Sequence, residues 1–332
     1  MNKEMKSKRN IIGAVALSLI LMGGSMSKAQ QAPTSNGSPI ITVFADAGAG
    51  FDKNGVASLG FNLERAYLGY QYKLNDNWKA KVVYDMGKGD DNALQRLGYV
   101  KNAEIDYSRG RWSVSMGLTS TTQFGVQEKF WGYRYVYKSM MDQCKWGSSA
   151  DLGVTATYKA TDWLSADLAI FNGEGYKKVQ ADEQLQYALG VTMKPVDGLT
   201  VRVYGDMKTY KDTVSQHNIV FFAGYKTKTM RVAAEYNVHL NHGGAESRRL
   251  QGVSVYGAVA TGEHGEVYAR YDRGDSFAND VWQYGQDGQT AIVGYHYQAN
   301  KIFSFSPNLR MNQATGSDKL SVFACVSMSV KF

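Results

Sequence analysis

The sequence predicts an all-β protein, a transmembrane antiparallel β-barrel of sixteen strands. Three observations support this fold: apolar and polar residues alternate with a period of two, the alternating segments have similar lengths, and the connections are alternately short and long. The alternation is clearest in residues 320–332, where Leu, Val, Ala, Val, Met, Val and Phe share one face. Successive side chains of a strand point to opposite faces, so this segment is a strand with one apolar face. A tilted strand of about ten residues crosses a bilayer.

The composition excludes several other classes of protein. The chain of 332 residues lacks the repeated runs of about 20 apolar residues that a helical membrane bundle needs. Aromatic residues make up 12% of the chain, which argues against disorder, and two Cys do not make a disulfide scaffold. Beyond residue 29 the chain has 32 basic and 29 acidic side chains, so it lacks the large basic excess of a nucleic-acid-binding protein.

Residues 1–29 are predicted to be a signal peptide. Five basic residues and one acidic residue accompany an apolar run at 11–22, which is too short to span a bilayer. Ser27 and Ala29 are the small residues that a signal peptidase reads, so cleavage is expected after Ala29. The alternative is a buried core helix. Cleavage leaves residues 30–332 as an exported barrel.

The sixteen predicted strands follow one another along this domain. They are expected to begin near Ser38, Leu59, Trp78, Gln95, Arg111, Asp151, Trp163, Gln184, Leu199, His217, Met230, Leu250, Gly265, Thr290, Ile302 and Lys319. Short turns such as 75–77 and 160–162 follow even strands, and longer polar loops such as 173–183 and 273–288 follow odd strands. This asymmetry is typical of bacterial outer-membrane barrels and puts both termini at the periplasmic rim.

Aromatic residues support a membrane-spanning barrel independently. Trp78, Trp112 and Trp163 each follow a short turn. Together with the terminal Phe332 they are predicted to form an aromatic girdle at one membrane interface. The alternative is that these rings pack the core of a soluble β-protein.

The chain resembles the Gram-negative outer-membrane porins, and more narrowly the phosphate-selective porin O and P family. The segments that carry the resemblance are Phe61–Tyr70 (FNLERAYLGY), Phe171-Asn-Gly173, Ser306–Arg310 (SPNLR) and Phe332. The resemblance implies that Phe332 is read by the barrel-assembly machinery and that the protein is a homotrimer. It also implies that the long connection after the fifth strand, residues 120–149, folds inward and narrows the channel. Its aromatic residues either contact solutes or only pin the loop.

Alternation also predicts which charges face the lumen. The predicted pore-lining residues are Arg65, Lys81, Arg134, Lys138, Arg202, Arg231, Arg270 and Arg310, opposed by Asp46, Asp85 and Glu235. Rings of basic side chains favour anions in pores. Alternatively, each Arg pairs with a neighbouring carboxylate and stiffens the wall. The fourth strand, near Val100–Tyr107, does not alternate cleanly, so its facing stays open.

The sequence therefore predicts a porin, a passive diffusion channel for small hydrophilic solutes with a weak preference for phosphate or similar anions. The sequence contains no nucleophile elbow, P-loop or zincin motif, and neither a cofactor nor a metal is expected. The expected partners are outer-membrane lipid, the solutes, the assembly machinery and two further copies of the chain. An outer-membrane barrel enzyme of the lipase or protease type, or a surface adhesin, is the alternative. Pairing of Cys144 with Cys325 stays undecided.

Overall fold

The computed structural model describes residues 36–52, 55–87, 98–180 and 183–332. The predicted signal peptide and its cleavage site lie outside the described residues, as does the predicted start of the fourth strand at Gln95. The described part belongs to one compact unit, residues 36–332. No helix in the described part of the chain is both long enough and apolar enough to cross a membrane.

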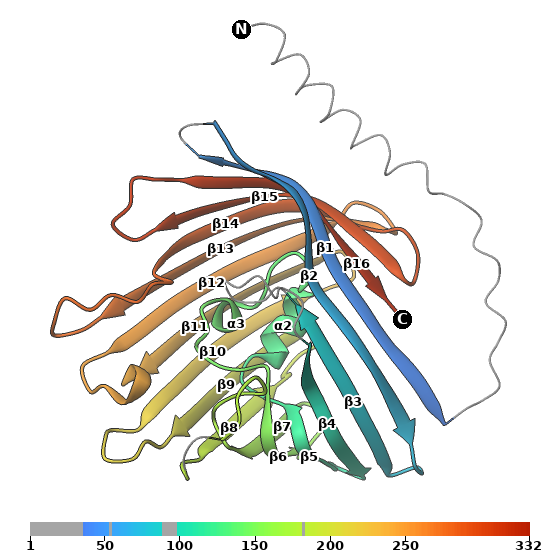
Figure 1. The fold of residues 1–332 in the computed structure, drawn as a ribbon. Coiled ribbons are helices and arrows are strands. Elements are labelled where there is room, and N and C mark those ends of the chain that lie inside the picture. The colour runs from blue at the N-terminus through green and yellow to red at the C-terminus, as the bar shows by residue number, and fades with distance from the viewer. Residues whose placement is uncertain (1–35, 53–54, 88–97, 181–182) are drawn as a thin grey trace, which may run out of the picture. The chain divides into compact units, whose positions relative to one another are not determined.

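The described residues form sixteen antiparallel strands in a closed barrel, so the predicted fold class is confirmed (Figure 1). Each strand pairs with its neighbours in the chain, and β1 closes the sheet by pairing with β16. The strands are β1 Gly37–Asp52, β2 Gly55–Lys73, β3 Trp78–Gly87, β4 Gly98–Arg109, β5 Trp112–Ser120, β6 Ala150–Lys159, β7 Leu164–Phe171, β8 Gln186–Met193, β9 Leu199–Lys208, β10 Gln216–Lys226, β11 Met230–Leu240, β12 Arg249–Ala260, β13 Gly265–Phe277, β14 Gly288–Gln298, β15 Phe303–Ala314 and β16 Ser321–Lys331.

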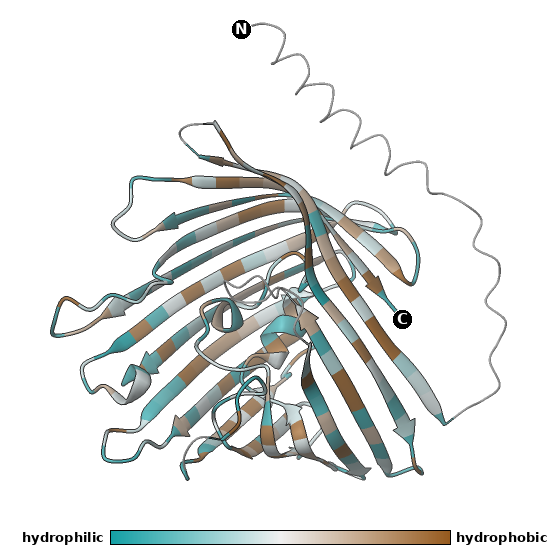
Figure 2. Ribbon diagram, in the orientation of Figure 1, coloured by the Kyte–Doolittle hydropathy of each residue, from teal (hydrophilic) through white to brown (hydrophobic). Residues whose placement is uncertain are grey.

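Figure 2 shows apolar and polar residues alternating along the strands. The burial of their side chains shows that this alternation gives an apolar exterior and a mixed interior. On neighbouring strands β7 to β10 the exposed side chains include Leu168, Tyr187, Leu189, Val203, Ile219 and Phe221. The residues between them on β9 and β10 are buried, and they are Arg202, Tyr204, Asp206, Asn218, Val220 and Phe222. A closed barrel satisfies every backbone group between strands, which is the condition for crossing lipid with β-structure.

A β-bulge explains why the fourth strand does not alternate cleanly. The register of β3 against β4 shifts between Val83 and Tyr84, so that Val83 pairs with Asn102 and Tyr84 pairs with Val100. Lys101 is the extra residue, and both it and Asn102 reach interior partners, because Lys101 bonds Ser149 and Asn102 bonds Ser120. A bulge inserts one residue and resets the alternation of the strand. The facing of β4 is thereby settled.

The predicted girdle residues are exposed at the rim of the short turns. Trp78 contacts Tyr107 and Trp112 contacts Tyr158 with tilted rings, whose centroids are 4.7 and 4.6 Å apart. Both pairs are directly opposite in the strand register. Trp163 lies in the turn before β7, and the N–H of Phe332 donates to the Ile41 carbonyl at 2.9 Å. All four side chains lie on the surface, where amphipathic rings suit a membrane interface.

Closure of the barrel predicts a gel-mobility shift. Purified protein in detergent should migrate differently on a denaturing gel before and after boiling, because a closed hydrogen-bonded sheet resists detergent at room temperature. Identical migration of both samples, together with recovery of the native protein in the soluble cell fraction, would contradict the membrane-barrel fold.

Candidate functional site

The connection between β5 and β6, residues 121–149, packs against the interior faces of the wall. It carries two short helices, α2 (Gly125–Trp131) and α3 (Met140–Gln143), which Figure 1 draws within the ring of strands. Trp131 is almost fully buried, and its ring lies 5.1 Å from Tyr256 and 5.6 Å from Tyr268. The Tyr256 hydroxyl donates to the carbonyl of Gln127 at 3.1 Å. These contacts fix α2 against β12 and β13.

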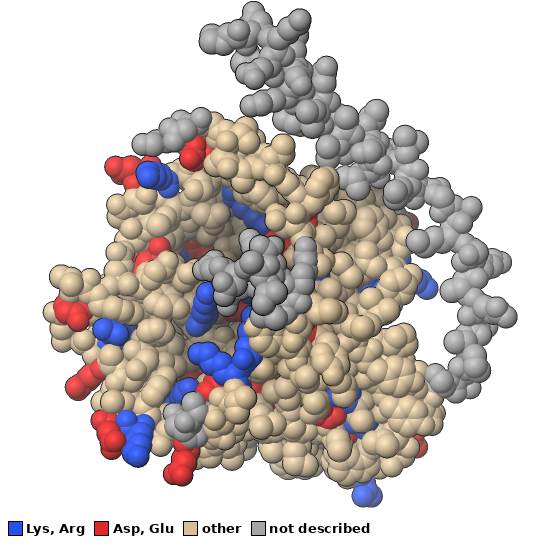
Figure 3. Space-filling view, viewed as in Figure 1, with Lys and Arg blue, Asp and Glu red and all other residues tan. Residues whose placement is uncertain are grey.

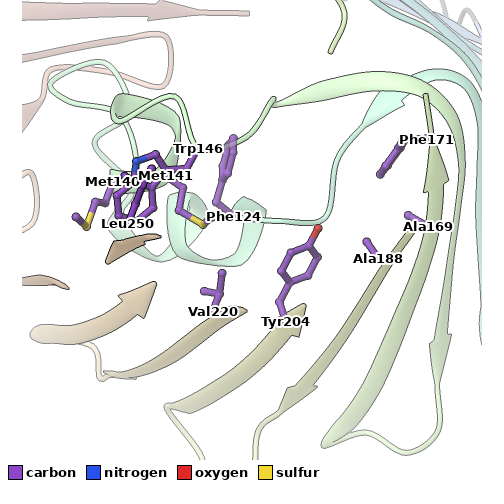
Figure 4. Packing of buried hydrophobic residues seen from close by; sticks show 10 residues of the cluster. All are labelled: Phe124, Met140, Met141, Trp146, Ala169, Phe171, Ala188, Tyr204, Val220 and Leu250. Atoms are coloured by element: carbon purple, nitrogen blue, oxygen red, sulfur yellow. The ribbon is translucent and has the colours of Figure 1, made fainter. Parts of the chain in front are cut away.

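A second apolar cluster holds the ends of the connection. Figure 4 shows its members, which are Phe124, Met140, Met141 and Trp146 of the connection and Ala169, Phe171, Ala188, Tyr204, Val220 and Leu250 of the wall. Met140 approaches the wall at Gly252, where an added Cβ would lie 2.0 Å from the methionine methyl group. The aromatic and Met residues of the connection therefore serve packing, which is one of the two roles that the sequence left open.

Arg202 and Arg270 are each paired with a carboxylate beneath the connection. Arg202 makes two hydrogen bonds to Asp167, at 2.6 and 2.9 Å, and donates to the carbonyl of Thr122 at 2.8 Å. Arg270 binds Asp272 through two hydrogen bonds of 2.8 and 2.7 Å, and its guanidinium lies 5.0 Å from the Trp131 ring centre. Both side chains are nearly inaccessible to solvent. They brace the wall and the connection.

Arg231 has the same type of environment as these two arginines. It bonds Glu266 at 3.1 Å and lies 4.4 Å from the centre of the Tyr133 ring. The Tyr133 hydroxyl donates to the same carboxylate. Arg231 therefore belongs with Arg202 and Arg270 as an anchor of the connection, and we call these three residues the anchor arginines.

The other face of the connection borders a cavity of about 580 Å³, which we call the lumen cavity. Four of the predicted pore-lining residues meet there, namely Arg65, Arg134, Lys138 and Arg310. The remaining charged residues of the lining are Lys145, Lys177 and Lys178 with Glu64, Asp142 and Glu174. Basic side chains therefore outnumber acidic ones by seven to three. The face shown in Figure 3 is hollowed, and Lys and Arg side chains lie in and beside the hollow.

Carboxylates compensate the four predicted basic residues of the lumen cavity in part. Arg65 pairs with Asp85, and Arg310 lies 3.5 Å from Asp46 and 2.6 Å from the Ser327 hydroxyl. Within the connection, Arg134 bridges Glu128 at 2.9 Å and Asp142 at 3.0 Å, and Lys138 lies 3.7 Å from Asp142.

Two predicted residues lie elsewhere on the wall. Lys81 pairs with Glu104 of the neighbouring strand β4. Glu235 is buried on β11, directly opposite Ser254, which is itself opposite Asp272. Neither side chain borders the lumen cavity.

Lys138 of the connection is largely buried and lies among charges of both signs. Burial lowers the pKa of its ammonium group, and the charges of Arg134, Arg65 and Lys177 lower it further, against the opposing effect of Asp142. Like charges disfavour the protonated form of an amine. The positive charges of Arg134, Arg65 and Lys177 would also attract an anion.

The segment 172–178, at the start of the long loop predicted at 173–183, reaches the same cavity. The Asp151 carboxylate accepts the N–H groups of Gly173 and Gly175, at 2.9 and 3.1 Å. Both glycines have positive φ angles, of 94° and 79°, a conformation that glycine adopts without strain. Tyr176 then donates to Asp85 at 2.6 Å. The sequence signal for this turn was the pair of glycines two residues apart.

Both cysteines are unpaired, with Cys144 in the connection and Cys325 buried on β16. Within the described part of the chain, no group of three or more His, Cys, Asp or Glu side chains is arranged to hold a metal ion. His239 and His242 do approach each other, with ring nitrogens 3.0 Å apart.

Several solved outer-membrane proteins share this fold. The chain is similar to an anion-selective porin from Comamonas acidovorans, with a TM-score of 0.63 and 14% identity over 89% of this chain and 100% of that one. It is also similar to the outer membrane channel DcaP of Acinetobacter baumannii. The TM-score is 0.64 and the identity is 14%, over 94% of this chain and 100% of that one. The chain is also similar to the trimer form of OmpT, an outer membrane protein of Vibrio cholerae. The TM-score is 0.58 and the identity is 15%, over 90% of this chain and 100% of that one.

No family model and no curated protein matches the sequence. The structural likenesses therefore define the class of fold, a porin-like outer-membrane barrel. The specific resemblance to the phosphate-selective porins is not confirmed by these comparisons.

The packing of the connection gives a testable difference between two tryptophans. Trp131→Ala should loosen the connection, because burying a large aromatic ring is worth about 3 kcal/mol or more. In planar bilayers the variant should show larger current fluctuations than the wild type. Trp163→Ala is the matched control, since Trp163 is 49% exposed and Trp131 is 1% exposed. Equal fluctuations in both variants would contradict the anchoring role of Trp131.

Proposed function

We propose that the protein is a passive diffusion channel for small hydrophilic solutes in the outer membrane of a Gram-negative bacterium. The observation that carries this proposal is the lumen cavity, because it lies between the barrel wall and the connection and half of its lining residues are charged. A polar interior inside a lipid-facing barrel is the arrangement of water-filled channels. In this proposal the connection 121–149 is the element that narrows the passage.

The arrangement of the histidines favours a channel over a barrel enzyme. Catalysis of the lipase or protease type needs a nucleophile beside a base. Among the described residues, the hydrogen bonds of His239 go to Asn218 and His242, and His296 bonds the hydroxyl of Tyr135. These histidines are therefore engaged in wall and loop packing. A surface adhesin remains the second alternative, and conductance separates it from a channel.

A weak preference for anions follows from the lining of the lumen cavity. Seven basic side chains face three acidic ones, and basic constrictions favour anions. Four of the seven basic side chains form ion pairs, and water screens the other three within a Debye length of about 8 Å. The preference for anions should therefore be modest, and it should fall as the salt concentration rises. Phosphate and similar small anions are the solutes in this proposal.

We propose further that the protein forms a homotrimer and that Phe332 is read during barrel assembly. The outward residues Ala45, Ala47 and Ala49 of β1 are small, so a neighbouring wall could approach closely there. The OmpT structure with the same fold is described as a trimer. Phe332 is exposed at the end of the chain, where another protein can contact it.

Planar bilayers test the channel and its selectivity together. The wild type should conduct, and its reversal potential in a potassium chloride gradient should have the sign of an anion-selective pore. The shift should shrink as the mean salt concentration rises. A sealed bilayer after verified insertion would contradict the channel and favour an enzyme or an adhesin. A cation-selective potential would contradict only the anion preference.

Crosslinking in isolated outer membranes tests the assembly. A short amine-reactive reagent should give species at two and three times the monomer mass. Exclusive recovery of monomer, under conditions that crosslink another trimer in the same membranes, would overturn the proposed trimer.

A further inference from the structure

The bulge in β4 places a lysine inside the barrel with neutral partners only. The Lys101 ammonium donates to the Ser149 hydroxyl at 3.0 Å and to the Tyr67 hydroxyl at 3.3 Å. It lies 4.9 Å from the centre of the Tyr67 ring and 5.5 Å from that of Tyr176. No carboxylate among the described residues lies within ion-pair distance of it, and Asp85 and Glu128 are near enough to feel its charge. Lys101 is half-buried, so its charge is only partly screened by water.

The segment 172–178 is tied to this region across the barrel. The Asp151 carboxylate shapes its base, and the Lys208 ammonium donates to the Gly173 carbonyl at 2.9 Å. Its tip is held by the hydrogen bond from Tyr176 to Asp85, which are 91 positions apart in the sequence. The Tyr176 ring also meets the Tyr99 ring of β4 edge to face, 6.5 Å between centroids. The segment therefore lines the lumen cavity beside the end of the connection, where the Tyr176 N–H donates to the Ala150 carbonyl at 3.0 Å.

Lys177 follows the residue that makes this hydrogen bond. Its ammonium lies 5.1 Å from the centre of the Tyr99 ring, and it borders the lumen cavity beside Lys178. Within the described part of the chain, Lys177 makes no ion pair. Arg65, Arg134 and Arg310, by contrast, each have a carboxylate within 4 Å. A paired charge acts at a distance as a dipole, whereas an unpaired charge keeps its long-range potential.

We propose that the segment 172–178 is a second constriction element and that Lys101 and Lys177 are the specificity-determining residues of the pore. The inference rests on the proposed channel function and goes beyond it, because it assigns the anion preference to two lysines and not to the arginines. Tyr176 and Asp85 act as positioning residues, since their hydrogen bond holds the segment across the lumen. The segment and the connection together line the lumen cavity.

Charge removal tests the two lysines. The double variant Lys101→Gln, Lys177→Gln should lower the chloride-to-potassium permeability ratio by about 1.5-fold for each charge removed. The control is Lys228→Gln, Lys301→Gln, which removes the same charge from exposed short turns at the other rim. Its ratio should stay at the wild-type value. An unchanged ratio in the first double variant, or an equal fall in the control, would overturn the assignment.

A second variant tests the hydrogen bond that holds the segment. Tyr176→Phe keeps the ring and removes the hydroxyl that donates to Asp85, so the segment should leave the lumen more often. We expect a lower permeability ratio together with larger current fluctuations. If the variant has the permeability ratio and the current fluctuations of the wild type, the positioning role of Tyr176 is overturned.

The two failures are distinguishable. If the wild type seals the bilayer, the channel function fails. If the wild type conducts and the variants keep its selectivity, only this inference fails. Retention of the gel-mobility shift in every variant confirms that the barrel has folded.

Discussion

The hydrogen bonds between β1 and β16 impose the organisation of the whole molecule. They run from Thr42 opposite Lys331 to Phe51 opposite Val322 and leave the sheet without an open edge in the part that lipid surrounds. Lipid offers no partner to a backbone N–H or C=O, so a β-structure that crosses a membrane must close. Closure then gives every strand one face toward lipid and one toward the interior.

Sixteen strands enclose more space than their own interior side chains fill, and the chain uses this space in two ways. On the side of β9 to β13, aromatic rings and the anchor arginines pack against the connection 121–149. On the side of β1, β2 and β15, the same connection faces the lumen cavity. Arg202 and Arg270, the two most deeply buried of these arginines, each make two charge-assisted hydrogen bonds to one carboxylate. Burying a charge is costly unless such partners are present, so their role is structural.

The strands could be predicted because their signal is local. Alternation indicates the two faces of a strand from that strand's own residues. It correctly predicted the first residues of β3, β9, β11 and β13, which are Trp78, Leu199, Met230 and Gly265. The strand β2 begins at Gly55, four residues before the predicted Leu59, because a hairpin with β1 continues beyond the register shift at Phe51.

The charge pattern of the interior could be predicted only in part. Which carboxylate neutralises an arginine depends on the register between strands, as for Arg202 on β9 and Asp167 on β7, and alternation contains no register. The bulge at Lys101 and the hydrogen bond from Tyr176 to Asp85 are likewise long-range features. A count of inward charges therefore does not show which of them are paired, and it left out Lys101 because the facing of the fourth strand stayed open.

The central claim is that ions pass through the lumen cavity beside the connection, and thiol modification at Lys138 tests it most directly. In a Cys144→Ser background, Lys138→Cys would place a single reactive thiol at the cavity, since Cys325 is buried in the wall. A negatively charged thiol reagent should then reduce the single-channel current in one step and shift the reversal potential toward cations. Full modification, verified by mass spectrometry, with unchanged current and potential would contradict the account.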